Sequence, residues 1–380
     1  MTSIVKAYVG ARIHDGATLH NTHALAVGQD GELRILPREA LPEGCAVVSL
    51  NQGIIAPGFV DLQVNGGGGV MFNDDQSPAA LRTIAQAHAT TGTVAILPTL
   101  ITDTAARTRA AIDAVEQAIA AGVDGIVGIH LEGPHLSIPR KGAHDPRLIR
   151  PMEAADLAVV LQAAKRLPNV MITVAPENTT TAQIKAMAEA GIVVSLGHTD
   201  ADFATCMAAF AAGARCVTHL FNAMSQLGNR EPGLVGAALA SGDIYAGIVA
   251  DGIHVHPQTL RLALAAKTNP ERLFLVTDAM AVAGSSITGF TLNGREVCRK
   301  DHRLTLADGT LAGADLEMQR ALSVMVENVG DDLALAIART SAIPAQLLRN
   351  PGEFGRLSVV ERAIYLPDNL SQVLPLAQAG

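Results

Sequence analysis

The sequence of 380 residues has few aromatic side chains and little cysteine, and no long apolar run. Phe, Tyr and Trp make up 3% of the chain and Trp is absent, so aromatic platforms for stacking bases or sugar rings are not expected. No apolar run approaches the roughly 18 residues of a membrane span, and the first residues show no basic segment followed by an apolar one. We therefore expect neither a membrane protein nor a secretion signal.

The four cysteines are widely spaced and include no C-x-x-C pair, which is typical of reduced thiols in the cytoplasm. A net charge of −8 argues against nucleic acid as a partner. It does not exclude an anionic substrate, because a few local cations can set the field of a pocket. With 49% hydrophobic residues the chain can build a large core, and we expect a cytoplasmic globular protein.

Eight short apolar runs alternate with Ala-rich helical stretches over most of the chain. The runs cover residues 54–64, 93–97, 125–131, 170–174, 192–196, 216–218, 245–249 and 274–276. Helices are predicted between them at 78–91, 103–121, 154–166, 181–190, 202–212 and 257–266. Continuous apolar strands that alternate with helices indicate a parallel sheet covered on both faces. Eight such units predict an α/β fold of the closed (β/α)₈ TIM-barrel type.

The two ends of the chain differ from this pattern. Residues 1–53 form short alternating segments separated by turns, residues 287–311 resemble hairpin strands, and residues 357–366 also resemble a strand. We predict that residues 1–53 and 344–380 pair into a small β-sandwich domain. Residues 54–343 then form the barrel, which the helical stretch 316–341 closes.

Four of the apolar runs end at a residue that can bind a metal or move a proton: Glu132, His198, His219 and Asp278. Alone, a histidine after a strand is more often a hydrogen-bonded core residue, and Asp278 could cap a helix. The carboxyl ends of barrel strands, however, meet at one mouth. A carboxylate and two imidazoles there can hold one divalent cation, and a further carboxylate can act as a base. The four together predict a metal-dependent hydrolase.

Seven motifs then occur in a fixed order along the chain. They are His130-Leu-Glu-Gly-Pro134, Lys141-Gly-Ala-His144, Gly197-His198-Thr199, Thr218-His-Leu-Phe-Asn-Ala-Met224, Arg230-Glu-Pro-Gly233, Asp251-Gly-Ile-His254 and Thr277-Asp-Ala279. From about Gly58 to Gly313 the sequence resembles the N-acetylglucosamine-6-phosphate deacetylases of the amidohydrolase superfamily. That resemblance implies hydrolysis of the acetamide of N-acetyl-D-glucosamine 6-phosphate to D-glucosamine 6-phosphate and acetate.

The resemblance also implies roles for the strand-end residues. Glu132, His198 and His219 would hold one divalent metal, most readily Zn²⁺, although Fe²⁺, Co²⁺ and Mn²⁺ accept the same ligands. Asp278 would take a proton from the attacking water and later give it to the leaving amine. His254 would help to polarise the acetamide carbonyl.

A sugar-phosphate site is implied as well, together with a homodimer. Arg230 would contact the phosphate of the neighbouring subunit's substrate, and the Asp251 loop would line the sugar. The remaining implied contacts come from three short segments: Ala143 and His144, Asn222 and Ala223, and Leu311, Ala312 and Gly313.

One departure from other amidohydrolases concerns the metal count. Many of them carry His-x-His after the first strand, where this sequence has Gln63-Val-Asn65. Amides are poorer metal ligands than imidazoles, so we expect one metal ion instead of two.

Three alternatives stay open at this point. The first is a deacetylase of N-acetylgalactosamine 6-phosphate, and the second is a hydrolase of cyclic amides or dipeptides, which usually carries His-x-His and a carbamylated lysine. The third is a non-catalytic barrel, which would be expected to lose metal ligands that this chain keeps.

Overall fold

The predicted barrel is confirmed by a computed structural model that describes residues 3–379. Eight parallel strands lie side by side in chain order. They are β8 (Phe59–Val64), β11 (Thr93–Ile101), β12 (Ile129–Glu132), β13 (Val170–Val174), β14 (Val193–Leu196), β15 (Cys216–Val217), β16 (Tyr245–Ile248) and β17 (Leu273–Leu275). The sheet curls round so that all eight carboxyl ends open toward one mouth.

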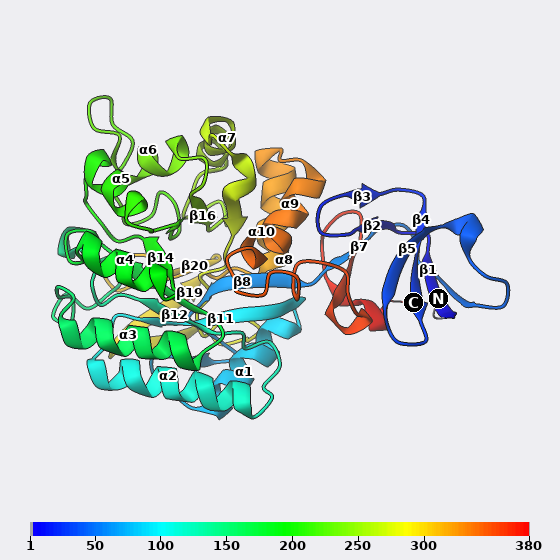
Figure 1. Cartoon of the computed structure of the whole chain (residues 1–380), viewed down its shortest axis with the longest axis horizontal. Helices are drawn as coiled ribbons and strands as arrows, with labels where there is room; N and C mark the ends of the chain where they lie inside the picture. Colours follow the sequence, from blue (N-terminus) through cyan, green and yellow to red (C-terminus); the bar gives the residue numbers. More distant parts are fainter. Residues whose placement is uncertain (1–2, 380) are drawn as a thin grey trace.

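Helices cover the outside of this sheet (Figure 1). They are α1 (Pro78–Ala89), α2 (Ala105–Ala120), α3 (Ala154–Arg166), α4 (Thr181–Glu189), α5 (Phe203–Ala211), α6 (Gly233–Ala240) and α7 (Pro257–Ala266). Side-chain caps start several of them; Thr180, for example, accepts a hydrogen bond from the backbone of Gln183 in a capping box. Only α6 was not predicted. Seven of its eight residues are buried, so its sequence lacks the polar face that gives an amphipathic period.

The first apolar run proved to be two strands, which corrects the prediction of one. β7 (Ile54–Pro57) pairs with strands of a separate sheet, and β8 starts the barrel after Gly58. A Cβ atom at Gly58 would lie 2.3 Å from Cγ1 of Val94, so the close approach of the two segments requires glycine.

The barrel closes between its first and last strands through a few backbone contacts. The Asp278 N–H donates to the Gln63 carbonyl at 3.0 Å, and the Asn65 N–H donates to the Ala279 carbonyl at 2.8 Å. Val64 and Ala279 form an isolated parallel bridge at the same level. This seam brings the residues after β17 directly beside the end of β8.

Two smaller sheets lie beside the barrel and take their strands from the early and late parts of the described chain (Figure 1). The first comprises β5 (Leu33–Pro37), β4 (His23–Gly28), β1 (Ile4–Val9) and β6 (Ala46–Ser49), in that spatial order. The second comprises β22 (Leu374–Pro375), β21 (Ala363–Leu366), β7, β2 (Arg12–His14) and β3 (Leu19–His20). They share an apolar cluster that includes Tyr8, Ile13, Leu25 and Ile55. The division into domains at residues 53 and 343 stays a prediction.

After β17 the chain forms a third small sheet, where hairpins were predicted. β18 (Gly289–Leu292), β19 (Arg295–Lys300) and β20 (Arg303–Leu306) are antiparallel. Their inner side chains join a cluster with Ile101 and Met280 near the mouth of the barrel. The helical stretch that follows consists of α8 (Met318–Ser323), a π-helical turn η4 (Val324–Val329), α9 (Leu333–Thr340) and α10 (Ala342–Ala345). α9 contacts β17 and β8, which places it at the seam.

Across residues 3–379, no helix has both the length and the apolar character that a membrane crossing requires.

Candidate metal centre and active site

The backbone turns sharply at three of the four strand-end residues. His198, His219 and Asp278 have φ angles of +48°, +31° and +51°. Residues other than glycine rarely adopt these left-handed values, and such strain concentrates at functional sites. Glu132 is the last residue of β12, so all four side chains leave the barrel at its carboxyl end.

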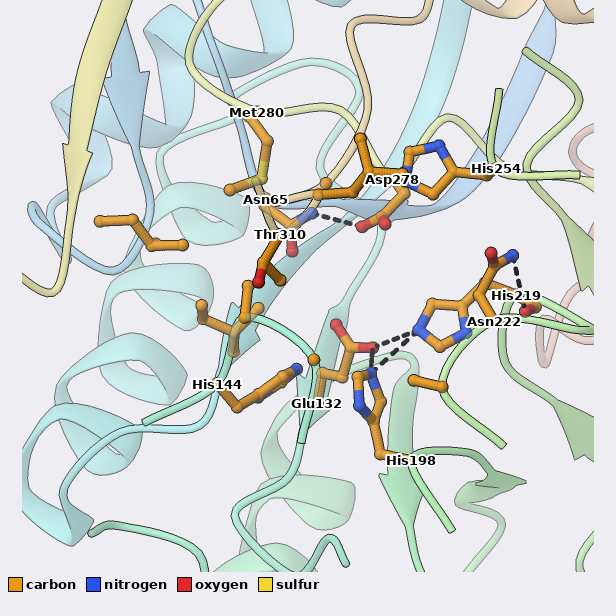
Figure 2. Close-up of a pocket in the computed structure, with 17 residues that line it drawn as sticks. Asn65, Glu132, His144, His198, His219, Asn222, His254, Asp278, Met280 and Thr310 are labelled. Carbon is orange, nitrogen blue, oxygen red and sulfur yellow. Dashed lines mark hydrogen bonds and ion pairs between the residues drawn. The ribbon is translucent and has the colours of Figure 1, made fainter. Parts of the chain in front are cut away.

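Three of these side chains converge on one point, as Figure 2 shows. Oε1 of Glu132 lies 3.1 Å from Nε2 of His198 and 3.1 Å from Nε2 of His219. The two imidazole nitrogens are 3.0 Å apart. All three residues are buried. Atoms that bind one tetrahedral Zn²⁺ at about 2.0–2.2 Å are themselves roughly 3.3 Å apart, close to the spacing seen here.

The hydrogen bonds of His198 show which of its nitrogens is available. Its Nδ1 lies 2.8 Å from the backbone carbonyl oxygen of Arg140, which can only accept, so Nδ1 carries the proton. In the neutral ring Nε2 then carries a lone pair and no hydrogen. It faces both the Glu132 carboxylate and the His219 imidazole. Two ring nitrogens and a carboxylate oxygen that meet without enough protons to bridge them fit a divalent cation.

Asp278 lies beside this group with one oxygen engaged. Its Oδ1 accepts hydrogen bonds from Nδ2 of Asn65 at 2.7 Å and from Nε2 of Gln63 at 3.2 Å. Burial, followed by the nearby Glu132 carboxylate, raises the pKa of Asp278 above its usual range. A carboxylate with a raised pKa at the mouth of a barrel is suited to accept and return a proton.

A second acid, Asp251, orients His254. Oδ1 of Asp251 accepts from the backbone N–H groups of Ile253 and His254, at 2.8 and 2.7 Å. Its Oδ2 lies 2.6 Å from Nδ1 of His254. The ring thus donates through Nδ1 to the carboxylate, and its Nε2 remains free for the cavity that His254 lines.

A cavity of about 260 Å³ opens above these groups. Seven of the residues predicted to contact substrate line it: Ala143, His144, Asn222, Ala223, His254, Leu311 and Gly313. Arg230, Asp251 and Ala312 do not. Arg230 is exposed, Asp251 stands behind His254, and Ala312 is buried in the cluster under β18–β20.

Sequence reasoning did not identify several lining residues, namely Asn65 as a wall of the cavity, Ile101, Gly142, Met280, Leu292 and Thr310. The place of Asn65 in the cavity could have been predicted, because Asn65 lies two residues after Gln63 and alternate residues of a strand share a face. The place of Leu292 could not have been predicted, because only the tertiary fold brings its hairpin to the cavity.

The cavity contains acids but no fixed cation. Glu132 and Asp278 line it, and no Lys or Arg among residues 3–379 does. The His144 ring is neutral, because burial, and then the nearby His198, lowers its pKa to about 3. Nδ1 of His144 accepts from the Thr102 N–H, so its Nε2 carries the hydrogen. An anionic ligand would therefore find neutral donors in this cavity but no full positive charge.

The fold and the metal-binding group together are those of a metal-dependent hydrolase of the amidohydrolase type. The chain belongs to the amidohydrolase family, which residues 54–363 match. It is 42% identical to the N-acetylgalactosamine-6-phosphate deacetylase of Shewanella sp. (strain ANA-3), over 87% of this chain and 83% of that protein. It is 35% identical to the N-acetylglucosamine-6-phosphate deacetylase of Haemophilus influenzae, over 89% and 88%.

Two solved structures of N-acetylglucosamine-6-phosphate deacetylases are similar to this chain in fold. The N-acetylglucosamine-6-phosphate deacetylase of Pasteurella multocida superposes with a TM-score of 0.91 at 33% identity, over 97% of both chains. A mutant of the Mycobacterium smegmatis enzyme was solved in complex with N-acetyl-D-glucosamine-6-phosphate. Its TM-score is 0.86 at 27% identity, over 99% of this chain and 98% of that one.

Proposed function

We propose that this protein hydrolyses the acetamide of N-acetyl-D-glucosamine 6-phosphate to D-glucosamine 6-phosphate and acetate. The observation that carries the proposal is the convergence of Glu132, His198 and His219 beside Asp278 at the base of the cavity. The deacetylase relatives and the likeness to a complex with this sugar phosphate support the choice of substrate.

We assign the metal to the Glu132, His198 and His219 group, with Zn²⁺ as the first choice and Fe²⁺, Co²⁺ or Mn²⁺ as possible substitutes. Such an ion acts as a Lewis acid and lowers the pKa of bound water toward about 7. Asp278 takes a proton from the attacking water and returns it to the nitrogen as the C–N bond breaks. With a hydrogen on both ring nitrogens, His254 donates from Nδ1 to Asp251 and from Nε2 to the acetamide carbonyl oxygen, where negative charge develops.

The phosphate is an anion, and no Lys or Arg among residues 3–379 lines the cavity of one chain to pair with it. We propose a homodimer in which Arg230 reaches the phosphate in the neighbouring subunit. Arg230 lies in a segment, residues 226–231, whose residues are all exposed and could therefore reach a second chain. Neutral donors from the His144 and Asn222 segments complete the phosphate site in this proposal, and the cytoplasm is the proposed location.

N-acetylgalactosamine 6-phosphate is the second candidate substrate. The specific observation in its favour is the 42% identity to the Shewanella protein that carries this name. The two sugars differ only in the configuration at C4, so the reaction and the metal group would be the same.

The test is a comparison of kcat/KM for both epimers and for unphosphorylated N-acetylglucosamine. We expect the glucosamine compound to be the best substrate and the unphosphorylated sugar to lose kcat as well as affinity, because phosphate contacts orient the amide. A higher kcat/KM for the galactosamine compound would select the second candidate. No acetate release from either phosphate would overturn the proposed function.

A further inference from the structure

Two amide side chains at the end of β8 direct their N–H groups at the same oxygen of Asp278. Nδ2 of Asn65 lies 2.7 Å from Oδ1, the contact drawn in Figure 2, and Nε2 of Gln63 lies 3.2 Å from it. No hydrogen bond among residues 3–379 uses Oδ2 of Asp278. Two donors on one oxygen fix the rotation of the carboxylate and leave the other oxygen available.

Gln63 also separates Asp278 from a second negative charge. Its Nε2 is 3.4 Å from Oε1 of Glu132, so the amide nitrogen stands between the two carboxylates. Without this donor, repulsion from Glu132 would favour rotation of the Asp278 side chain away from the metal-binding group.

The same short segment holds the backbone of Asp278. The Gln63 carbonyl accepts from the Asp278 N–H, and the Asn65 N–H donates to the Ala279 carbonyl. These bonds span the residue whose φ is +51°, a value that persists only where the surroundings enforce it. Backbone and side chain of Asp278 are thus fixed by one segment of β8.

A purely structural role explains Asn65 poorly. Its Oδ1 is buried and has no hydrogen-bond partner among residues 3–379. A buried acceptor without a partner lowers stability, whereas an apolar side chain of similar size would not. The amide of Asn65 instead provides the hydrogen bond from its Nδ2 to Oδ1 of Asp278.

We propose that Asn65 and Gln63 are positioning residues that hold the Asp278 carboxylate with Oδ2 turned toward the attacking water. This inference rests on the proposed function, in which Asp278 is the base. It goes beyond the expectation drawn from the sequence, where the Gln-x-Asn pair only predicted one metal ion instead of two. Positioned acid–base groups depend on fixed geometry, because small misplacements cost large factors in rate.

The test compares near-isosteric apolar variants, Asn65→Leu and Gln63→Met, with a matched control. In the control, Thr93→Val, another buried oxygen without a partner is removed at the amino end of β11, at the opposite end of the barrel. We expect Asn65→Leu to lower kcat at least about tenfold, but by no more than the 10²–10⁴-fold that the positioned proton-transfer group itself supplies. KM, metal content and melting temperature should stay near wild type, and the control should retain wild-type kcat.

Three results would overturn the inference. They are a kcat for Asn65→Leu within about twofold of wild type, a loss of kcat that only follows a loss of bound metal, and a crystal structure of Asn65→Leu with the Asp278 carboxylate unmoved. If wild-type protein releases no acetate from either sugar phosphate, the proposed function fails instead. The crystal structure of the variant then decides the inference without turnover.

Discussion

Replacement of the proposed base by its neutral isostere, Asp278→Asn, should remove most turnover and leave the structure intact. Oδ1 of Asp278 accepts from Asn65 and Gln63, so an asparagine can keep both bonds by placing its own oxygen there. Its NH₂ group then occupies the position of Oδ2, where it cannot accept a proton. General acid–base catalysis contributes typically 10²–10⁴-fold. That factor corresponds to roughly 3–5 kcal/mol of transition-state stabilisation.

The same substitution has a predictable sign for stability. The folded-state pKa of Asp278 is raised, by burial first and by Glu132 second, so folding favours its protonated form. The fold therefore loses stability as pH rises above about 3.9, the pKa of an aspartate in the unfolded chain. At neutral pH the buried charge of Asp278 lowers the free energy of unfolding. In the metal-free protein the neutral asparagine removes this unfavourable charge, so the melting temperature of that form at pH 7 to 8 should be equal or higher.

The assay combines kcat for acetate release with metal analysis and thermal unfolding of the same samples. We predict a large loss of kcat with unchanged bound metal, and no loss of stability in the metal-free protein. A variant with near-normal kcat would remove Asp278 as the base. Metal loss in step with activity would instead assign Asp278 to the metal site.

Three further predictions test separate parts of the account. Arg230→Ala should weaken turnover of phosphorylated substrate far more than that of the unphosphorylated sugar, and equal losses on both would show that Arg230 does not contact the phosphate. In the metal-free protein the free energy of unfolding should fall more steeply above about pH 4 in wild type than in Asp278→Asn, because the folded-state pKa of Asp278 is raised; equal slopes would contradict this. Gly58→Ala should destabilise the fold by about 1–3 kcal/mol through overpacking against Val94, measured by denaturant unfolding, and an unchanged midpoint would be inconsistent with the close approach seen there.

The barrel could be predicted because its strands are short and buried on both faces. β13 and the helices α3 and α7 occupy the predicted residues, since apolar runs and helix periods are local properties of the sequence. α6 was not predicted because a helix that is buried on all sides has no polar face, and its sequence therefore shows no amphipathic period. The break at Gly58 was missed because only contact with Val94, from another strand, requires it.

The site divides in the same way. Glu132, His198 and His219 could be grouped from sequence, because the carboxyl ends of parallel strands must meet in a barrel. The contact between Asn65 and Asp278 could not, since it depends on how the first and last strands meet at the seam. Leu292 reaches the cavity only through the fold of the third small sheet, and Arg230 acts, in our proposal, through a second chain.

Removal and return of the metal, with N-acetyl-D-glucosamine 6-phosphate as substrate, shows most directly whether a metal held by Glu132, His198 and His219 carries the reaction. Acetate release and bound metal would be measured on one sample before chelation, after it, and after titration with Zn²⁺. We predict that activity disappears with the metal and returns in proportion to one ion per chain. Full activity in the metal-free protein, or a need for two ions per chain, would contradict it.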